Sequence, residues 1–282
     1  MSYLSEVFSS IQGEGGTIQG SCFGKHQIFI RYSGCNIAQK RFGTDGCFWC
    51  DSIESQYPKP KKFWYEKLPN SKQKTFSNNP VKIPELIEII RNLVTKDLHS
   101  ISFTGGEPLF QLKFLLELAY ELNNQSEFKY PLYLETNGSL IPNNSQYEHL
   151  GKFFSFCCCD IKDRSSQAAE PARWDELVNN ELEFIRNLIF NGVKTFAKIV
   201  VTSETQIQDI EWIAEELFKI KYQNGDSVGL AIQPVFLENQ KLKQQFSIST
   251  DHLNQLFYAA AKYIEPKNLT LSIQAHKHLN LL

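Results

Sequence analysis

The stretch that organises this chain runs from Gly34-Cys35-Asn36 to Gly46-Cys47-Phe48-Trp49-Cys50. Its three thiols have the spacing C-x11-C-x2-C, and no fourth cysteine or histidine follows close by to complete a tetrahedron. A structural zinc site uses four protein ligands, whereas a cubane iron–sulfur cluster held by three cysteines leaves one iron open for a small molecule. The spacing alone leaves zinc and an iron–sulfur cluster as equal alternatives.

The composition is that of an ordinary globular protein. The chain has 282 residues, 42% of them hydrophobic, and a formal net charge of −2, which gives no overall attraction to nucleic acid or acidic membranes. Residues 1–20 contain no apolar run typical of a signal peptide, and no window reaches the roughly 18 apolar residues of a membrane span. Seven cysteines, three of them consecutive, fit a reducing compartment. We expect a cytoplasmic protein without a membrane segment or a nucleic-acid partner.

Short β-rich segments alternate with amphipathic segments along most of the chain. We predict strands at residues 27–32, 100–104, 132–135, 153–161, 195–201, 228–233 and 269–273, and helices at 83–94, 109–122, 180–190, 207–220 and 251–263. This alternation indicates parallel βαβ units in an α/β fold that closes partly or wholly into a barrel. We expect a single domain over residues 1–282, with a cluster loop and an insertion at 36–80.

The insertion is rich in Lys, Asn, Ser and Pro between residues 55 and 80. We predict a solvated loop or a small inserted subdomain there. Its lysines and the aromatic run Phe63-Trp64-Tyr65 would also suit a nucleic-acid patch, but a run of charge is more often a hydrated surface.

The remaining cysteines are not predicted to form a second metal site. Cys157, Cys158 and Cys159 lie consecutively in a predicted strand, where successive side chains point to opposite faces. We therefore expect them, and Cys22, to be buried as small hydrophobic residues.

Polar residues follow the ends of several predicted strands, which share one face in a parallel barrel. Asn137, Asp160 and Lys162, with Lys198 and Gln233 as weaker candidates, are therefore predicted to meet over one site, with turn caps or ion pairs as the alternative. Near the N-terminus, a glycine-rich turn offers the Gln12 amide and the Glu14 carboxylate to a ligand, or is a mobile turn. Arg31, just before the first thiol, is placed to bind a substrate carboxylate with two hydrogen bonds, or is a surface charge.

Several motifs in order resemble a known family. Trp49-Cys50, Gly105-Gly106-Glu107-Pro108 and Glu135-Thr136-Asn137-Gly138 resemble those of radical S-adenosylmethionine enzymes, although the usual first thiol gap is three residues. The expanded gap is similar to that of the 7-carboxy-7-deazaguanine synthase family. So are Ser10-Ile11-Gln12-Gly13-Glu14-Gly15, Arg31-Tyr32-Ser33-Gly34-Cys35-Asn36, Cys50-Asp51-Ser52 and Gln274-Ala275-His276-Lys277. The resemblance extends from Ser10 to Lys277 and leaves residues 55–80 uncovered.

The resemblance implies a radical S-adenosylmethionine barrel of the (β/α)6 type, partial or modified, and a carbon–nitrogen lyase. It implies that Cys35, Cys47 and Cys50 hold a 4Fe-4S cluster whose open iron binds S-adenosylmethionine. The expected contacts to S-adenosylmethionine are Trp49, Gly105, Gly106, Glu107, Asn137, Asp160, Lys162, Lys198 and Gln233. The carboxylate of Glu107 is expected to meet the methionine ammonium.

The resemblance also implies a substrate and partners. The 5′-deoxyadenosyl radical would take the C6 hydrogen of 6-carboxy-5,6,7,8-tetrahydropterin, giving 7-carboxy-7-deazaguanine and ammonia in queuosine-type biosynthesis. The expected substrate contacts are Gln12, Gly13, Glu14, Arg31, His276 and Lys277. Ser52 takes the place of a threonine that ligates Mg²⁺ in the family. An electron donor such as flavodoxin or ferredoxin, and a homodimer, are also implied.

Two other functions stay open from the sequence. One is a related activating enzyme that forms a glycyl radical on a partner protein and has no need of a pterin-binding set. The other is a zinc-stabilised binding module that holds RNA with its basic insertion.

Overall fold

The computed structural model describes residues 1–279 and 281–282, and in them ten strands form one sheet with the order β10-β9-β8-β7-β6-β5-β2-β1-β3-β4. Its central strands run parallel: β2 (His26–Tyr32), β5 (Leu98–Gly105), β6 (Leu132–Thr136), β7 (Phe154–Ile161), β8 (Lys194–Val201), β9 (Gly229–Pro234) and β10 (Leu269–Leu271). Each predicted parallel strand is present, so the α/β prediction is confirmed. The order is linear, and β10 and β4 are its two ends, as in a barrel that stays open.

The N-terminal side of the sheet is mixed. β1 (Leu4–Ile11) pairs antiparallel with β2, and β3 (Lys62–Glu66) runs parallel to β1 and antiparallel to β4 (Lys74–Asn78). Residues 55–80 therefore form an antiparallel hairpin that extends the sheet, which the polar composition did not predict. The hairpin is held to the rest of the sheet because two of its side chains are buried: Phe63 and Glu66 are both about 1% exposed, although most of the neighbouring residues are polar.

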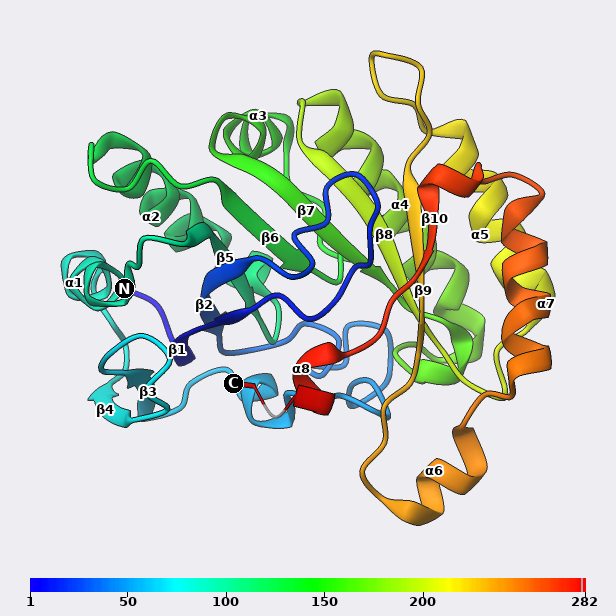
Figure 1. Ribbon diagram of the computed structural model, residues 1–282, viewed down its shortest axis with the longest axis horizontal. Coiled ribbons are helices and arrows are strands. Elements are labelled where there is room, and N and C mark those ends of the chain that lie inside the picture. The colour runs from blue at the N-terminus through cyan, green and yellow to red at the C-terminus, as the bar shows by residue number, and fades with distance from the viewer. Residues whose placement is uncertain (280) are drawn as a thin grey trace.

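Helices cover one face of the sheet (Figure 1). They are α1 (Ile83–Leu93), α2 (Leu112–Asn124), α3 (Asn144–Phe153), α4 (Trp174–Phe190), α5 (Ile207–Lys219) and α7 (Thr250–Ala261), with α6 (Gln240–Phe246) and α8 (Ala275–Leu279) outside this layer. Helix α3 was not predicted, because its apolar pattern is weak; its start is set by a capping box between Asn143 and Gln146. Helix α4 begins six residues before the predicted start, at the buried Trp174.

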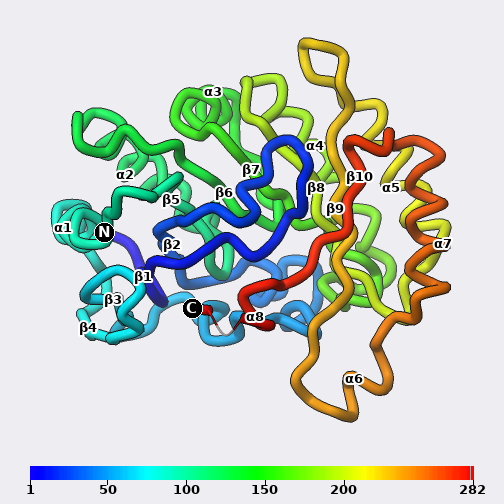
Figure 2. Tube along the Cα trace, in the orientation of Figure 1, coloured from blue at the N-terminus to red at the C-terminus, as the bar shows by residue number. Residues whose placement is uncertain are grey.

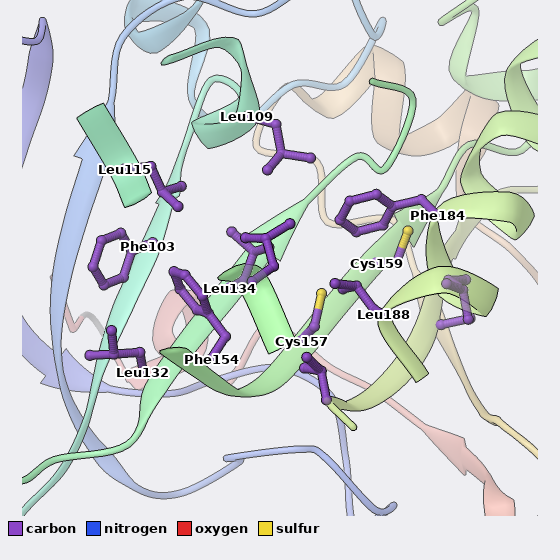
Figure 3. Close-up of a cluster of buried hydrophobic side chains, with 14 of the residues drawn as sticks. Phe103, Leu109, Leu115, Leu132, Leu134, Phe154, Cys157, Cys159, Phe184 and Leu188 are labelled. Carbon is purple, nitrogen blue, oxygen red and sulfur yellow. The ribbon is translucent and has the colours of Figure 1, made fainter. Parts of the chain in front are cut away.

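The alternation of side chains along the strands produces two separate apolar layers. Figure 3 shows Cys157 and Cys159 in the layer beneath the helices, with Phe184 and Leu188 of α4. Cys158 instead belongs to a smaller cluster on the opposite, concave face of the sheet, with Tyr133 and others. All three thiols are free and buried, as their alternation in the sequence predicted.

The concave face is closed at one end by the N-terminal segment 12–25. This segment crosses in front of the central strands in blue (Figure 2). Ile18 and Cys22 pack from it into the concave cluster, and its Gly20 approaches the Lys194 carbonyl so closely that a Cβ would lie 2.7 Å from that oxygen. The other end of the concave face, where the parallel strands finish, stays open.

We predict that the hairpin is anchored mainly by Glu66. Its buried carboxylate accepts hydrogen bonds from the backbone amides of Ser9 (3.0 Å) and Lys72 (2.7 Å). Glu66→Ala would leave these donors without that acceptor, so we expect the free energy of unfolding in urea to fall by about 1–3 kcal/mol. The matched control Glu85→Ala removes an exposed carboxylate that accepts from Ser77 and is expected to cost less than about 0.5 kcal/mol. Equal losses in the two variants would contradict the anchoring role.

Candidate active site

A cavity of about 650 Å³ opens where the parallel strands end. It is lined by the cluster loop, the N-terminal turn, the strand ends and the C-terminal helix α8, so segments far apart in the sequence meet there. The predicted site residues that line it are Gln12, Gly13, Glu14, Arg31, Cys35, Cys47, Trp49, Cys50, Ser52, Gly105, Gly106, Asn137, Asp160, Lys162, Lys198, Gln233, His276 and Lys277. Glu107 is absent from this lining.

The three thiols of the cluster loop face this cavity. Burial, with smaller contributions from the neighbouring Cys35 and Cys50, raises the pKa of Cys47 to about 12, while Lys162 opposes the rise. Four thiolates around zinc lie about 3.8 Å apart, given Zn–S bonds of about 2.3 Å. In the described part of the chain, only Glu14, Asp51 and His276 bring such ligand atoms within 4.8 Å of one another as a set. The three cysteine sulfurs are therefore not all within 4.8 Å of one another, which is wider than the sulfur spacing around a shared zinc ion.

Two glycines allow the turn after β5 to lie directly against the cluster loop. Gly105 has a φ of +136°, and a Cβ on it would lie 2.3 Å from the Tyr32 carbonyl oxygen. A Cβ on Gly106 would lie 2.4 Å from the carbonyl oxygens of both Gly34 and Ser55. Larger residues would push the two loops apart, so these glycines set the width of the cavity beside the thiols.

Glu107 lies behind this turn and is fully buried. Its carboxylate accepts hydrogen bonds from the Leu109 amide (2.9 Å), the Thr136 hydroxyl (2.7 Å) and the Asn137 amide (2.8 Å). Burial raises its pKa despite these donors. In this structure the carboxylate joins the turns after β5 and β6, behind the glycines that line the cavity, and its contact with a methionine ammonium stays a prediction.

A chain of opposite charges crosses the cavity floor. Lys198 pairs with Glu14 and lies 3.9 Å from Asp160, which in turn pairs with Lys162 at 2.7 Å. Burial opposes the charge of Asp160, but the two lysines outweigh it and lower its pKa. One oxygen of Asp160 has no hydrogen-bond partner among the described residues and so is available to a ligand.

Other predicted residues are oriented by their neighbours. Asn137 donates to Asn36 at 3.1 Å and its side-chain nitrogen lies 4.0 Å from the Cys35 sulfur. Gln233 is buried and accepts from the Ser272 hydroxyl at 2.6 Å. Trp49 contacts Phe48 edge to face, with ring centroids 6.3 Å apart.

The predicted substrate side is centred on Arg31. Its Nε donates to Glu6 and its Nη1 donates to the Ser52 hydroxyl at 3.1 Å, which holds the guanidinium toward the cavity. His276 lies against Gly13, where a Cβ would be 2.7 Å from the histidine Nδ1. The N-terminal turn and the C-terminal helix are thereby joined at one wall of the cavity.

Several cavity residues were not predicted from the sequence. Glu135 is enclosed by the Gln12 amide and the Thr104 hydroxyl, and burial followed by repulsion from Glu14 raises its pKa. Gln274 donates to Glu14 at 2.8 Å and to Asp51 at 3.0 Å. The position of Glu135 could have been predicted from the sequence. Side chains alternate between the two faces of a strand, so if Leu132 and Leu134 face the helices, Tyr133 and Glu135 face the concave side.

Comparisons with known proteins agree with this geometry. Residues 12–179 match the family described as a 4Fe-4S single cluster domain. The 7-carboxy-7-deazaguanine synthase of Thermococcus kodakarensis is 36% identical over 280 residues, covering 99% of this chain and 98% of that protein. That of Methanocaldococcus jannaschii is 32% identical, covering 99% of this chain and all of that protein.

This chain belongs to the 7-carboxy-7-deazaguanine synthase family. The predicted recognition of the family is confirmed, including the span 55–80 that the motif resemblance left uncovered. The family match is to a 4Fe-4S cluster domain, so the zinc-stabilised module is set aside.

Solved structures support the fold. The crystal structure of QueE from Escherichia coli matches 98% of this chain and 94% of that chain, with a TM-score of 0.55 at 20% identity. A structure of anSMEcpe with bound AdoMet and Cp18Cys peptide matches 85% of this chain and 60% of that chain, with a TM-score of 0.52 at 15% identity. At these identities the likeness shows the fold alone.

None of the described helices of this chain is both long enough and apolar enough to cross a membrane.

We predict that Glu107 is required for stability at the cavity rim. Glu107→Gln puts an amide nitrogen where a carboxylate oxygen accepts hydrogen bonds, so we expect the free energy of unfolding, measured anaerobically, to fall by about 1–3 kcal/mol. Glu54→Gln, at an exposed position of the same cavity, is the control and is expected to be neutral. A Glu107→Gln protein as stable as its parent would show that this carboxylate does not hold the two turns.

Proposed function

We propose that this chain is a radical S-adenosylmethionine lyase that converts 6-carboxy-5,6,7,8-tetrahydropterin to 7-carboxy-7-deazaguanine and ammonia. The observation that carries the proposal is that three thiols and the polar strand ends line one cavity in a member of this family. We also propose that the enzyme acts in the cytoplasm, where its thiols would stay reduced, and that it assembles as a homodimer.

The cofactor side of the cavity is proposed as follows. Cys35, Cys47 and Cys50 would hold the cluster and would leave one of its irons open to S-adenosylmethionine. When bound, the cluster and S-adenosylmethionine supply the radical that removes the substrate C6 hydrogen. The Gly105-Gly106 turn offers its backbone to the methionine portion, and Asn137, Asp160, Lys162, Lys198 and Gln233 contact the remainder, with Trp49 beside it. Glu107 serves by holding this turn in place.

The substrate side uses residues from both ends of the chain. Gln12, Gly13 and Glu14 match the donors and acceptors of the pterin edge, while Arg31, His276 and Lys277 bind its carboxylate. Glu14 pairs with Lys198 in the described structure, so substrate binding exchanges this ion pair for contacts to the pterin.

A Mg²⁺ ion is proposed at Ser52. The Ser52 hydroxyl accepts from Arg31 and donates to Asp51 at 3.0 Å, in surroundings rich in oxygen ligands, as a hard cation prefers. Ser52 would hold the ion, which would supply positive charge beside Arg31 for the substrate carboxylate.

The turnover assay tests the proposed function directly. We expect the anaerobically reduced protein with S-adenosylmethionine, Mg²⁺ and the carboxylated tetrahydropterin to form an ultraviolet-absorbing deazapurine. Cys47→Ala is expected to lose the cluster's visible absorbance and all turnover while keeping its far-ultraviolet circular dichroism. The matched control Cys157→Ala removes a thiol that faces the helices and is expected to retain the cluster. Cleavage of S-adenosylmethionine without any deazapurine would favour the glycyl-radical activating enzyme instead.

Replacement of Arg31 tests the carboxylate-binding role. Arg31→Lys keeps the positive charge but loses the planar fork, so we expect KM for the carboxylated pterin to rise by about tenfold to a hundredfold. The affinity for S-adenosylmethionine is expected to change little, as measured by equilibrium binding. A variant with an unchanged KM would remove Arg31 from the substrate site.

A further inference from the structure

Residues 55–82 form a strongly basic segment in a chain that is otherwise acidic. They contain seven lysines and one acidic residue, a net charge of +6 within a chain of net charge −2. The acidic residue is Glu66, which is buried, so it adds no negative charge to the surface of the segment. Such an asymmetry produces a local positive potential despite the acidic total.

The lysines at the start of this segment are not neutralised. Lys59, Lys61 and Lys62 are exposed, and within the described part of the chain no acidic group lies within ion-pair distance of them. Elsewhere, exposed lysines such as Lys262 and Lys267 each pair with a carboxylate at 2.7 Å. We call the surface of Lys59, Lys61 and Lys62 the lysine face.

The lysine face adjoins the cluster loop. The carbonyl of Ser55 accepts a hydrogen bond from the Gly34 amide at 2.7 Å, directly before Cys35. The Cα of Pro58 would lie 3.3 Å from a Cβ on Gly34. The chain therefore passes from the backbone that holds the first thiol straight into the lysine face, and Figure 1 shows the light-blue cluster loop beside the β3–β4 hairpin.

Exposed apolar side chains lie in the same short segment. Ile53 is 68% exposed and Tyr57 is 62% exposed, between Cys50 and Lys59. Ile53 lies at the rim of the cavity beside the acidic Asp51 and Glu54, whereas Tyr57 lies outside the cavity lining, two residues before Lys59. An exposed aromatic side chain beside unpaired charge is typical of a protein-binding surface, where the apolar group gives contact and the charge gives orientation.

We infer that the lysine face, with Ile53 and Tyr57, is the docking surface for an acidic one-electron carrier protein. The inference rests on the proposed function, which needs one external electron to reduce the cluster. The reduced carrier loses one electron and the oxidised cluster gains one, with no bond formed between the proteins. Charge complementarity favours an acidic carrier, and the contact at Gly34 brings it to the side of the loop that holds Cys35. RNA would also meet positive charge here, but it would bring no electron to a cluster.

The test compares reductants of different size and charge. The cluster-loaded protein with S-adenosylmethionine is mixed anaerobically with reduced acidic flavodoxin, and one-electron oxidation of the flavin is followed by stopped flow. For the triple variant Lys59→Glu, Lys61→Glu, Lys62→Glu we expect oxidation to slow by about tenfold or more at low salt. Added salt is expected to slow the parent protein and to leave the variant nearly unchanged. Reduction by dithionite, an anion, and by reduced methyl viologen, a cation, is expected to stay within about twofold of the parent, because neither needs the docking surface.

The matched control places the same charge change at the other end of the strands. Lys96, Lys129 and Lys152 are exposed and precede β5, β6 and β7, so their triple change to Glu is expected to leave flavodoxin oxidation within about twofold of the parent.

Unchanged oxidation in the lysine-face variant would overturn the inference, as would an equal loss in the control or with the small reductants. Loss of tRNA binding with unchanged flavodoxin oxidation would assign the face to RNA instead. Failure of S-adenosylmethionine cleavage with every reductant in the parent protein would refute the proposed function itself.

Discussion

The backbone of the cluster loop and the turn after β5 touch at Gly34 and Gly106, and no side chain fits between them. The Gly34 carbonyl accepts from the Glu107 amide at 2.8 Å, while its amide donates to Ser55 on the far side of the loop. Behind this contact, the buried Glu107 carboxylate ties the same turn to the end of β6. The position of Cys35 relative to the strand ends follows from these few backbone contacts, because none of them allows a shift without leaving a buried polar group unpaired.

The charges inside the cavity are held against one another before any ligand arrives. Lys198 stands between Glu14 and Asp160, and Asp160 also pairs with Lys162. A buried charge is costly when alone, so each carboxylate in this row is held near a cation. A ligand with its own charges is therefore bound by exchange of partners, which favours ligands whose charges match the row.

The β3–β4 hairpin faces both the cavity and the solvent. Trp64 and Lys74 line the cavity, with the Lys74 nitrogen 4.3 Å from the centre of the tryptophan ring, and Trp64 stacks on Phe8 of β1. The other lysines of the segment point to solvent. The hairpin thus closes one wall of the site and presents charge outward beside the cluster loop. The hairpin can do both because it lies at the edge of the sheet, where β4 has a neighbouring strand on one side only.

The sequence by itself determined the parallel α/β core, because period-2 and period-3.6 apolar patterns are local properties of the chain. It also determined the three thiols, the alternate faces of Cys157, Cys158 and Cys159, and the polar residues at strand ends, whose convergence follows from parallel topology. Only the tertiary structure decided the direction of the Glu107 carboxylate, the enclosure of Glu135 by Gln12, and the attachment of residues 55–80 to β1. These features depend on which distant backbone donors surround a side chain after folding, and no spacing within the sequence records them.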